Sequence, residues 1–149
     1  MKPLPDKAAR LRALTDHGST LLVEAGAGSG KTALMAGGVV LLLAAGVAPR
    51  RIAAITFTEL AAGELFSRIG EFLDDLLAGT LPPGLDAALP QGLDSAQRAN
   101  LEAARQSIGE LTVSTIHGFC QALIRPYPVE AGMDPGARVM DPRGAALAW

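Results

Sequence analysis

Cysteine, aromatic residues and net charge are all scarce in this sequence of 149 residues. Its single cysteine, Cys120, excludes a disulfide bond within the chain and favours a reducing, cytoplasmic location. Aromatic residues make up only 4% of the chain, so each aromatic side chain that falls in a motif is informative. The formal net charge of −2 excludes nucleic-acid binding by bulk electrostatic attraction, and any such binding needs a local groove.

Long hydrophobic runs are also lacking. The longest, Ala33–Ala45, has 13 residues and contains two glycines, whereas a membrane-spanning helix needs about 17–25 residues. The first six residues carry charges and prolines where a signal peptide needs an apolar core. We therefore expect no membrane partner. Because 49% of the residues are hydrophobic and 19% are charged, the chain is expected to bury a core as one domain.

Expected strands and helices alternate along the chain. Short apolar runs that end in turn-forming or polar residues predict buried strands at Thr20–Ala25, Arg51–Phe57 and Leu111–Thr115. Helical spacing and length predict helices at Leu4–Asp16, Lys31–Ala45, Glu59–Leu77, Ser95–Ile108 (with Ser95 as the N-cap) and His117–Ile124. Residues 79–94 are rich in proline and glycine and predict a loop, and irregular structure is expected from Tyr127 onward. This alternation predicts an α/β fold with a parallel sheet.

The most informative segment reads Ala-Gly-Ala-Gly-Ser-Gly-Lys-Thr at residues 25–32, between an expected strand and an expected helix. Its glycines allow successive N–H groups to point into one concavity, and the helix that follows adds its positive end. The lysine can reach the β- and γ-phosphates of a nucleotide, and the threonine hydroxyl can bind Mg²⁺. The predicted nucleotide-binding residues are Ala25, Gly26, Ala27, Gly28, Ser29, Gly30, Lys31 and Thr32, the last two in a catalytic role and Thr32 as the metal ligand.

The general form of this motif has glycine at the first position, where this chain has Ala25. The alternative interpretation is a glycine-rich turn with an incidental lysine. The Gly-Lys-Thr triplet, the glycines and the strand–helix context all favour nucleotide binding, although they do not indicate which process the nucleotide drives.

Two further segments follow the second and third expected strands. The first reads Thr-Phe-Thr-Glu-Leu-Ala-Ala at residues 56–62, and the second reads Thr-Ile-His-Gly-Phe at residues 115–119. The carboxyl ends of parallel strands meet at one edge of a sheet, which is where ligands bind in open α/β folds. Aromatic and hydroxyl side chains suit single-stranded nucleic acid, because bases stack on the rings. The alternatives are that the phenylalanines pack in the core and that His117 is a hydrogen-bonded structural residue.

Together these three segments resemble the superfamily-1 helicases of the UvrD/Rep type, most nearly the helicase–nuclease branch with its RecB-like and AddA-like subunits. Residues 130–135 (EAGMDP) look like the E-A-G-x-D-P of those relatives, and the resemblance covers about residues 4–142. It implies a RecA-like P-loop NTPase fold, ATP and Mg²⁺ as cofactors, and an ATP-dependent translocase or helicase of DNA repair or recombination. The residues that it implies on single-stranded DNA are Thr56, Phe57, Thr58, Thr115, His117 and Phe119.

The sequence departs from the family pattern at several positions. Ala8 stands where the family commonly has the glutamine that reads adenine, and Arg10 is a candidate to stack on the base by its guanidinium plane. Leu60 replaces a lysine near the implied DNA path. Gly37 and Gly38 lie inside an expected helix, where each glycine costs roughly 1 kcal/mol relative to alanine.

The largest departure is that no apolar run is followed by Asp-Glu, the acidic strand that the family uses to bind Mg²⁺ and orient water. The chain is therefore expected to be the N-terminal part of the ATP-binding domain, lacking this Walker B strand and the second motor domain. Residues 71–110 would form a helical and loop insertion, and residues 126–149 would begin a further subdomain. The absent strand normally lies beside the phosphate-loop strand, so an open apolar strand edge is expected, to be covered by the rest of the helicase or by a partner protein.

The sequence leaves two other functions open. A catalytically inert module would bind nucleotide or a partner chain without turning ATP over. A small-molecule kinase would share the phosphate loop but would not need the two strand ends with their aromatic residues. Cys120, on an apolar helix face, is expected to be a small buried hydrophobic residue.

Overall fold

The structure is a computed structural model that describes residues 6–26 and 28–134. The chain divides into two compact units between Thr115 and Ile116. Among the described residues, the first unit holds four α-helices and both strands, and the second holds one helix and the segment that follows it. Of the predicted site residues, only Ala27 lies outside the described residues.

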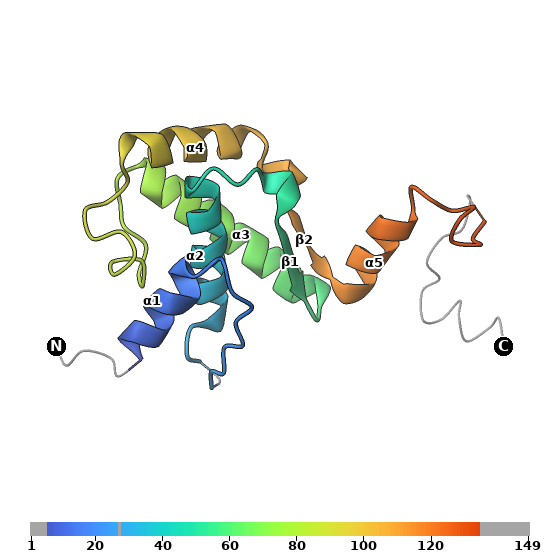
Figure 1. Ribbon diagram of the computed structural model, residues 1–149, viewed down its shortest axis with the longest axis horizontal. Helices are drawn as coiled ribbons and strands as arrows, with labels where there is room; N and C mark the ends of the chain where they lie inside the picture. Colours follow the sequence, from blue (N-terminus) through green and yellow to red (C-terminus); the bar gives the residue numbers. More distant parts are fainter. Residues whose placement is uncertain (1–5, 27, 135–149) are drawn as a thin grey trace. The chain divides into compact units, whose positions relative to one another are not determined.

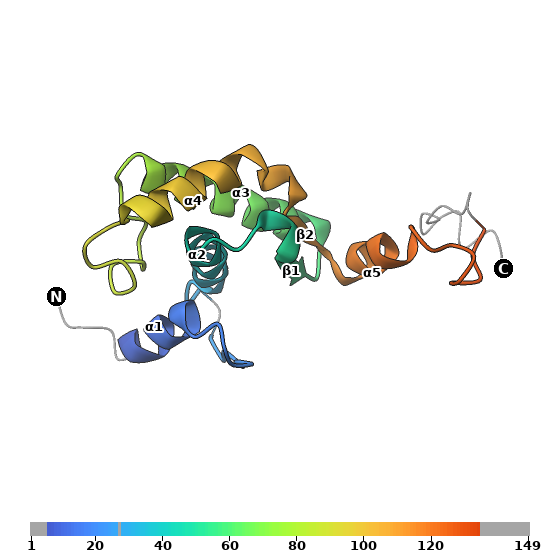
Figure 2. The same cartoon turned by 45° about the horizontal axis from the view of Figure 1, so that its top comes forward.

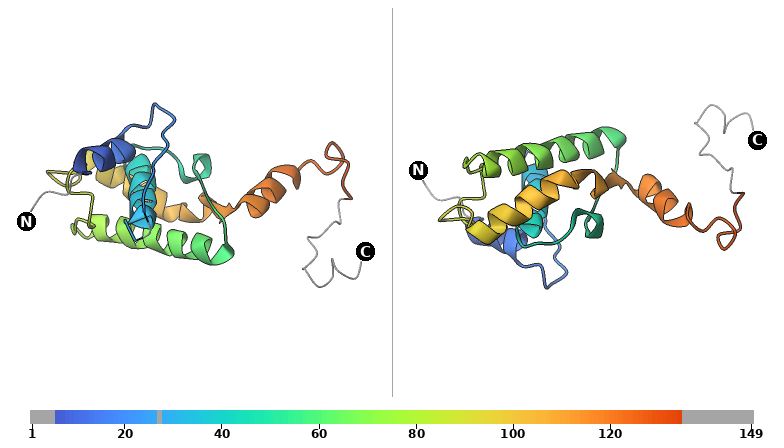
Figure 3. Two further views of the ribbon diagram at one scale, coloured as in Figure 1. Left: turned by 90° about the horizontal axis from the view of Figure 1, so that it is seen from below. Right: turned by 90° about the horizontal axis from the view of Figure 1, so that it is seen from above.

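The first unit is built around helix α2 (Lys31–Ala44). In Figures 1 and 2, α2 has α1 (Lys7–Thr15) on one side and α3 (Glu59–Leu77) and α4 (Ser95–Gln106) on the other. The right-hand view of Figure 3 shows α3 and α4 running alongside each other. The core gathers apolar side chains from all four helices and from the loop between α3 and α4. Its most buried large members are Leu14, Val40, Leu43, Leu65, Ile69, Leu73, Leu85 and Leu101.

The predicted helices are confirmed with small changes at their ends. Helix α3 has the predicted bounds, and α2 is buried from Ala36 to Ala44 apart from Gly38 and Leu42, as expected for a helix that is apolar nearly all round. The N-cap of α4 is Asp94 rather than the predicted Ser95. The Asp94 carboxylate accepts a hydrogen bond from the Gln97 backbone N–H at 2.7 Å, and the Gln97 side chain accepts one from the Asp94 N–H at 3.0 Å. This reciprocal pair satisfies two donors, which a serine one residue later does not.

Helix α4 also completes the C-terminal ends of its neighbours. Asn100 Nδ2 donates to the carbonyl oxygen of Ala44, the last residue of α2, at 2.9 Å. Arg98 Nη1 donates to the carbonyl oxygen of Leu77, the last residue of α3, at 2.7 Å. These donors satisfy carbonyl groups that have no intrahelical partner. Residues 71–110, expected as an insertion, therefore contribute Leu73, Leu85 and Leu101 to the core and close the ends of two helices.

Gly37 has a packing role in the middle of α2. A Cβ added at Gly37 meets Leu85 Cδ2 at 2.8 Å and Leu14 Cδ2 at 3.2 Å, and both leucines are buried. The missing side chain therefore lets α1 and the loop at residues 79–94 approach α2 closely. At Gly38 an added Cβ meets nothing within 4 Å, so packing does not explain that glycine.

The sheet of the first unit has two parallel strands, β1 (Ala53–Thr56) and β2 (Thr112–Thr115). Their register pairs Ala53 with Thr112 and Thr56 with Thr115, so the carboxyl ends of both strands meet. Short 3₁₀ turns at Pro49–Arg51 and Ile108–Glu110 precede the strands, and α3 packs against both. The predicted parallel α/β arrangement is confirmed to this extent.

The strand predicted at residues 20–25 is wrong. This segment is irregular and exposed, with Leu22 89% exposed and Val23 47% exposed. A strand needs a hydrogen-bonded neighbour, and the two strands among the described residues pair only with each other. The apolar run therefore has strand composition without the partner that would make it a strand.

The second unit contains α5 (Ile116–Ile124), followed by turns and irregular backbone as far as Asp134. No residue of α5 is buried, and Cys120 is exposed, so its predicted burial is wrong. The helix is largely apolar, and its residues are exposed or half-buried. Of the segment at 130–135, residues 130–132 form turns, residues 133 and 134 are irregular, and Pro135 lies outside the described residues. No helix in the described part of the chain has the length and apolar character to cross a membrane.

Candidate nucleotide and nucleic-acid site

The glycine-rich loop meets α2 in a conformation that only glycine adopts readily. Gly28 has φ +72°, and Gly30, the N-cap of α2, has φ +83°. This left-handed backbone costs other residues roughly 1–2 kcal/mol. An added Cβ at Gly26 or Gly28 meets nothing within 4 Å, so Gly28 is required for its backbone angle rather than for space.

The Gly26 carbonyl oxygen accepts most of the hydrogen bonds among the described residues of the loop. It accepts hydrogen bonds from Lys31 Nζ at 2.7 Å, from Ser29 Oγ at 2.7 Å and from the Ser29 backbone N–H at 3.3 Å. Lys31 Nζ also donates to the Ala25 carbonyl oxygen at 2.9 Å. These two bonds place the ammonium group over the start of the loop, and the lysine side chain is exposed.

The first turn of α2 leaves donors facing the loop. Leu34 N–H is the first backbone donor of the helix to find a helical acceptor, the Gly30 carbonyl oxygen at 2.9 Å. The N–H groups of Lys31, Thr32 and Ala33 precede it and have no acceptor within the helix. Thr32 is exposed in this same turn. Backbone donors, an ammonium group, a hydroxyl group and the positive end of α2 thus lie together.

Arg10 of α1 reaches the other end of the loop. Its Nη2 donates to the Ser29 carbonyl oxygen at 2.9 Å, and its Nε donates to Asp6 Oδ2 at 2.7 Å. The sequence suggested that this guanidinium stacks on a nucleotide base. The structure instead shows it bonded to the loop backbone, and the stacking role stays a prediction.

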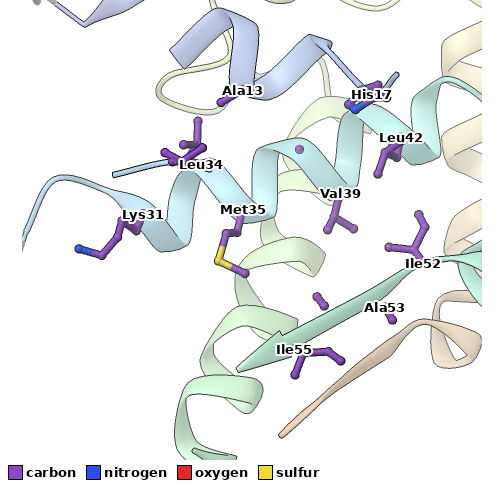
Figure 4. A pocket seen from close by; sticks show the side chains of 13 residues that line it. Ala13, His17, Lys31, Leu34, Met35, Val39, Leu42, Ile52, Ala53 and Ile55 are labelled. Atoms are coloured by element: carbon purple, nitrogen blue, oxygen red, sulfur yellow. The ribbon is translucent and has the colours of Figure 1, made fainter. Parts of the chain in front are cut away.

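An apolar cleft of about 410 Å³ lies between α2 and β1. Figure 4 shows Met35, Val39 and Leu42 projecting from α2 toward Ile52 and Ile55. No residue of β2 lines the cleft, and β1 has no other strand neighbour among the described residues. The open edge expected beside the phosphate-loop strand has no counterpart, because residues 20–25 form no strand; the cleft lies instead along β1.

The segment that leads from α1 into the loop is held by polar contacts. The pKa of the Asp16 carboxyl lies below its usual value, mainly because the Ser19 side chain donates a hydrogen bond to the carboxylate. Partial loss of solvent opposes this shift, and Arg12, whose Nε lies 3.5 Å from Asp16 Oδ2, adds to it. Arg12 is exposed and Asp16 is half-buried, whereas the core side chains that pack against α2 are buried.

The carboxyl ends of the strands carry the second group of predicted site residues. Phe57 follows β1 and is 90% exposed, so the alternative that it packs in the core is wrong. Thr58 is the N-cap of α3, because its hydroxyl oxygen accepts a hydrogen bond from the Ala61 N–H at 3.1 Å. The Thr56 hydroxyl donates to the Thr58 carbonyl oxygen at 3.0 Å. These bonds hold the turn that presents the phenylalanine.

Glu59 is a residue of this edge whose role the sequence did not reveal. The Thr115 hydroxyl, at the end of β2, donates to Glu59 Oε1 in the first turn of α3 at 3.0 Å. Thr115 is 7% exposed, and this partly buried bond joins the end of β2 to the first turn of α3. A residue separation of 56 conceals this contact in the sequence, and only the parallel register reveals it.

The remaining two predicted DNA-binding residues belong to the second unit. His117 is exposed and Phe119 is half-buried, both on α5. Their contact with DNA stays a prediction.

Comparison with known proteins decides the family. Residues 7–146 match the UvrD/REP helicase N-terminal domain. The chain belongs to this family. The resemblance seen in the three sequence segments is thereby confirmed, and the α/β unit with its small parallel sheet is consistent with such a helicase domain.

The relatives of this UvrD/REP domain include three bacterial proteins, each named as a subunit of an ATP-dependent helicase/nuclease. The protein from Moorella thermoacetica is 35% identical over 141 residues, or 93% of this chain and 9% of its own length. Those from Listeria monocytogenes serotype 4a and Desulfitobacterium hafniense are each 34% identical, over 88% and 91% of this chain. The chain spans about a tenth of the length of the curated relatives that it matches.

Proposed function

We propose that residues 25–32 and the first turn of α2 bind the triphosphate of ATP. The domain would then be the ATP-binding portion of an ATP-dependent single-stranded-DNA translocase or helicase, acting in DNA repair or recombination. The observation that carries this proposal is the set of donors at the start of α2. Lys31 Nζ, the first amides of the helix and the Thr32 hydroxyl share one turn at the positive end of a 14-residue helix.

The residues present suit the phosphates of ATP and a Mg²⁺ ion, the two groups that membership of this helicase family implies. Among the described residues, Lys31 Nζ donates to two carbonyl oxygens, which are weaker partners for an ammonium ion than phosphate oxygens are. Thr32 supplies one neutral oxygen, which suits Mg²⁺ because that ion keeps most of its water ligands. Bound Mg²⁺ would supply charge neutralisation at the β- and γ-phosphates. Lys31 and Thr32 would hold the phosphates and the metal ion, and the loop backbone would orient them.

Single-stranded DNA is the second proposed ligand, at the strand ends of the first unit. Phe57 presents an exposed ring on a turn held by the Thr56 and Thr58 hydrogen bonds. Stacking of a base on such a ring is worth about 1–3 kcal/mol. The turn after β1 carries no positive charge: Leu60 stands in place of a lysine, and Glu59 adds a carboxylate. Binding here would therefore depend on stacking more than on phosphate contacts.

Titration of the 149-residue chain with Mg·ATP tests the nucleotide site. We expect Lys31→Ala to weaken binding by at least tenfold, because the variant loses a charge-assisted contact worth about 1.5–3 kcal/mol. Lys7→Ala is the matched control. Lys7 is an exposed lysine of α1, and its ammonium group pairs with Asp86 at 3.8 Å rather than with residues 25–32. Equal affinities for the wild-type chain and Lys31→Ala would contradict the proposal.

Titration with a fluorescent single-stranded oligonucleotide tests the second ligand. We expect Phe57→Ala to lose about 5- to 150-fold in affinity, the equivalent of one stacked base. Phe66→Ala is the control, because Phe66 is also exposed, at 40%, but lies two turns into α3. A loss of the same size in both variants would exclude a specific role for Phe57.

Binding without turnover is the second candidate function for this chain by itself. It is favoured by the absence of any Asp-Glu pair after an apolar run in the sequence. Release of inorganic phosphate, measured with and without the oligonucleotide, separates the two candidates. Turnover above that of Lys31→Ala would exclude the binding module, and binding without turnover would support it.

A further inference from the structure

Asp6, Arg10 and Leu14 form a ladder on one face of α1 and its N-cap. They are spaced four residues apart, so each lies one helical turn from the next. Leu14 is 2% exposed and packs over Gly37 of α2, which anchors the C-terminal half of α1 in the core. Arg10 lies one turn earlier on the same face, where the phosphate loop meets α2. The packing of Leu14 thereby fixes the position of Arg10 next to the Ser29 end of the loop.

The Arg10 guanidinium is restrained from two sides. Nε donates to Asp6 Oδ2 at 2.7 Å, and Nη2 donates to the Ser29 carbonyl oxygen at 2.9 Å. Nη1 lies 3.7 Å from the position of a Cβ added at Gly30, so the guanidinium lies over the backbone of that glycine. The Arg10 side chain is 32% exposed, which shields these bonds from water more than an open surface pair.

The bond to Ser29 has a geometric consequence for the next amide. In a trans peptide group the carbonyl oxygen and the following N–H point in opposite directions, and the described chain has no cis peptide bond. Because the Ser29 carbonyl points toward Arg10, the Gly30 N–H points away from Arg10. Gly30, with φ +83°, is the N-cap that leads directly into the first turn of α2.

We propose that Arg10 is a positioning residue for the phosphate loop, which fixes the Ser29–Gly30 peptide group so that the Gly30 N–H is presented to a bound polyphosphate. This inference rests on the proposed nucleotide site. It differs from the expectation that Arg10 stacks on the nucleotide base, because a positioning residue acts on the phosphates through the loop and is indifferent to the base.

The ligand pair that separates these roles is Mg·ATP and inorganic tripolyphosphate, which has the phosphates without base or ribose. Isothermal titration of the 149-residue chain gives the affinity for each. We expect Arg10→Ala to weaken both ligands to a similar degree, by about tenfold, the usual effect of losing one charge-assisted hydrogen bond. Arg10→Lys should recover only part of the affinity, because a single ammonium group does not reproduce the fork that joins Asp6 to Ser29.

Two further variants keep the test independent of folding. Asp6→Asn leaves Arg10 in place but weakens its restraint, and we expect a smaller loss for both ligands. Arg12→Ala is the matched control, because Arg12 is an arginine of the same helix that also pairs with an aspartate four residues away, at the end of α1 remote from the loop contact of Arg10. We expect Arg12→Ala to bind both ligands as the wild type does.

A spectroscopic measurement reports on the peptide group itself. In ¹⁵N-labelled protein without ligand, we expect the Gly30 amide resonance to shift in Arg10→Ala and to stay in place in Arg12→Ala. A purely structural role of Arg10 in holding α1 would instead shift resonances along α1 and leave Gly30 unchanged.

The outcomes are distinct. A loss confined to ATP would show that Arg10 contacts the base and would overturn the positioning role. Unchanged affinity for tripolyphosphate in Arg10→Ala would also overturn it while leaving nucleotide binding intact. If the wild-type chain binds neither ligand, the proposed nucleotide site itself fails, and the inference fails with it.

Discussion

The two ends of α2 lie in different surroundings. From Ala36 to Ala44 most of the helix is buried among α1, α3 and α4, and its last carbonyl accepts a hydrogen bond from Asn100. From Lys31 to Met35 it is exposed or half-buried, and its first amides have no helical acceptor. One end of the same helix is thus packed and satisfied, and the other presents donors.

This difference shows how the unit combines stability with a candidate site. Burial of apolar side chains around the C-terminal half holds the helix, at roughly 25 cal/mol for each Å² removed from water. The N-terminal turn is then positioned without being covered. A ligand that brings negative charge to that turn finds donors that the helix has not used, so binding requires no rearrangement of the core.

The largest effect that separates the two ends is expected from truncation of a core side chain. Leu43 is 1% exposed in the packed half, and Leu43→Ala should lower the free energy of unfolding by about 2–5 kcal/mol, because it leaves a cavity. Met35, in the open half, is 44% exposed, and Met35→Ala should cost about 1 kcal/mol or less. Urea denaturation of both variants measures the difference. Losses of equal size would show that the open end is packed as tightly as the buried end.

The two neighbouring glycines where the halves join should respond to alanine with opposite signs. Gly37→Ala places a methyl group against the buried Leu85 and Leu14, and we expect a net loss of about 1 kcal/mol after the helical gain is subtracted. Gly38→Ala meets no atom within 4 Å and should raise stability by up to about 1 kcal/mol. Thermal unfolding of the pair provides the comparison. Stabilisation by both substitutions would mean that Leu85 has room to move.

The smallest effect concerns Asp16, at the entry to the open region. Because the pKa of Asp16 is lowered in the folded state, ionised Asp16 stabilises the fold at pH values above the ordinary aspartate pKa. This contribution is lost as the pH falls through the lowered pKa. NMR titration of the Asp16 carboxyl should find a midpoint below the ordinary one. Ser19→Ala should raise that midpoint more than Arg12→Ala, because the Ser19 hydrogen bond is the larger cause. The reverse order would show that the arginine dominates.

Helices were predicted well, and strands only where they have a partner. Helix α3 has the predicted bounds because its amphipathic spacing and the Thr58 cap are both local features. Residues 20–25 have the composition of a strand, but pairing is a property of two segments, and none of the described segments pairs with this one. Cys120 illustrates the same limit for burial, because an apolar helix face is buried only where another element covers it.

The sequence by itself determined the phosphate-loop motif, the helices and the family, because each depends on residues close together in the chain or on a specific string of letters. Only the tertiary structure decided that Arg10 holds Ser29, that Thr115 bonds Glu59, and that Gly37 is enclosed by Leu14 and Leu85. The first two contacts join residues 19 and 56 positions apart, and the third brings α1 and a distant loop to the middle of α2. Such pairs leave no periodicity in the sequence, since their geometry arises only when α1, α2 and the sheet pack together.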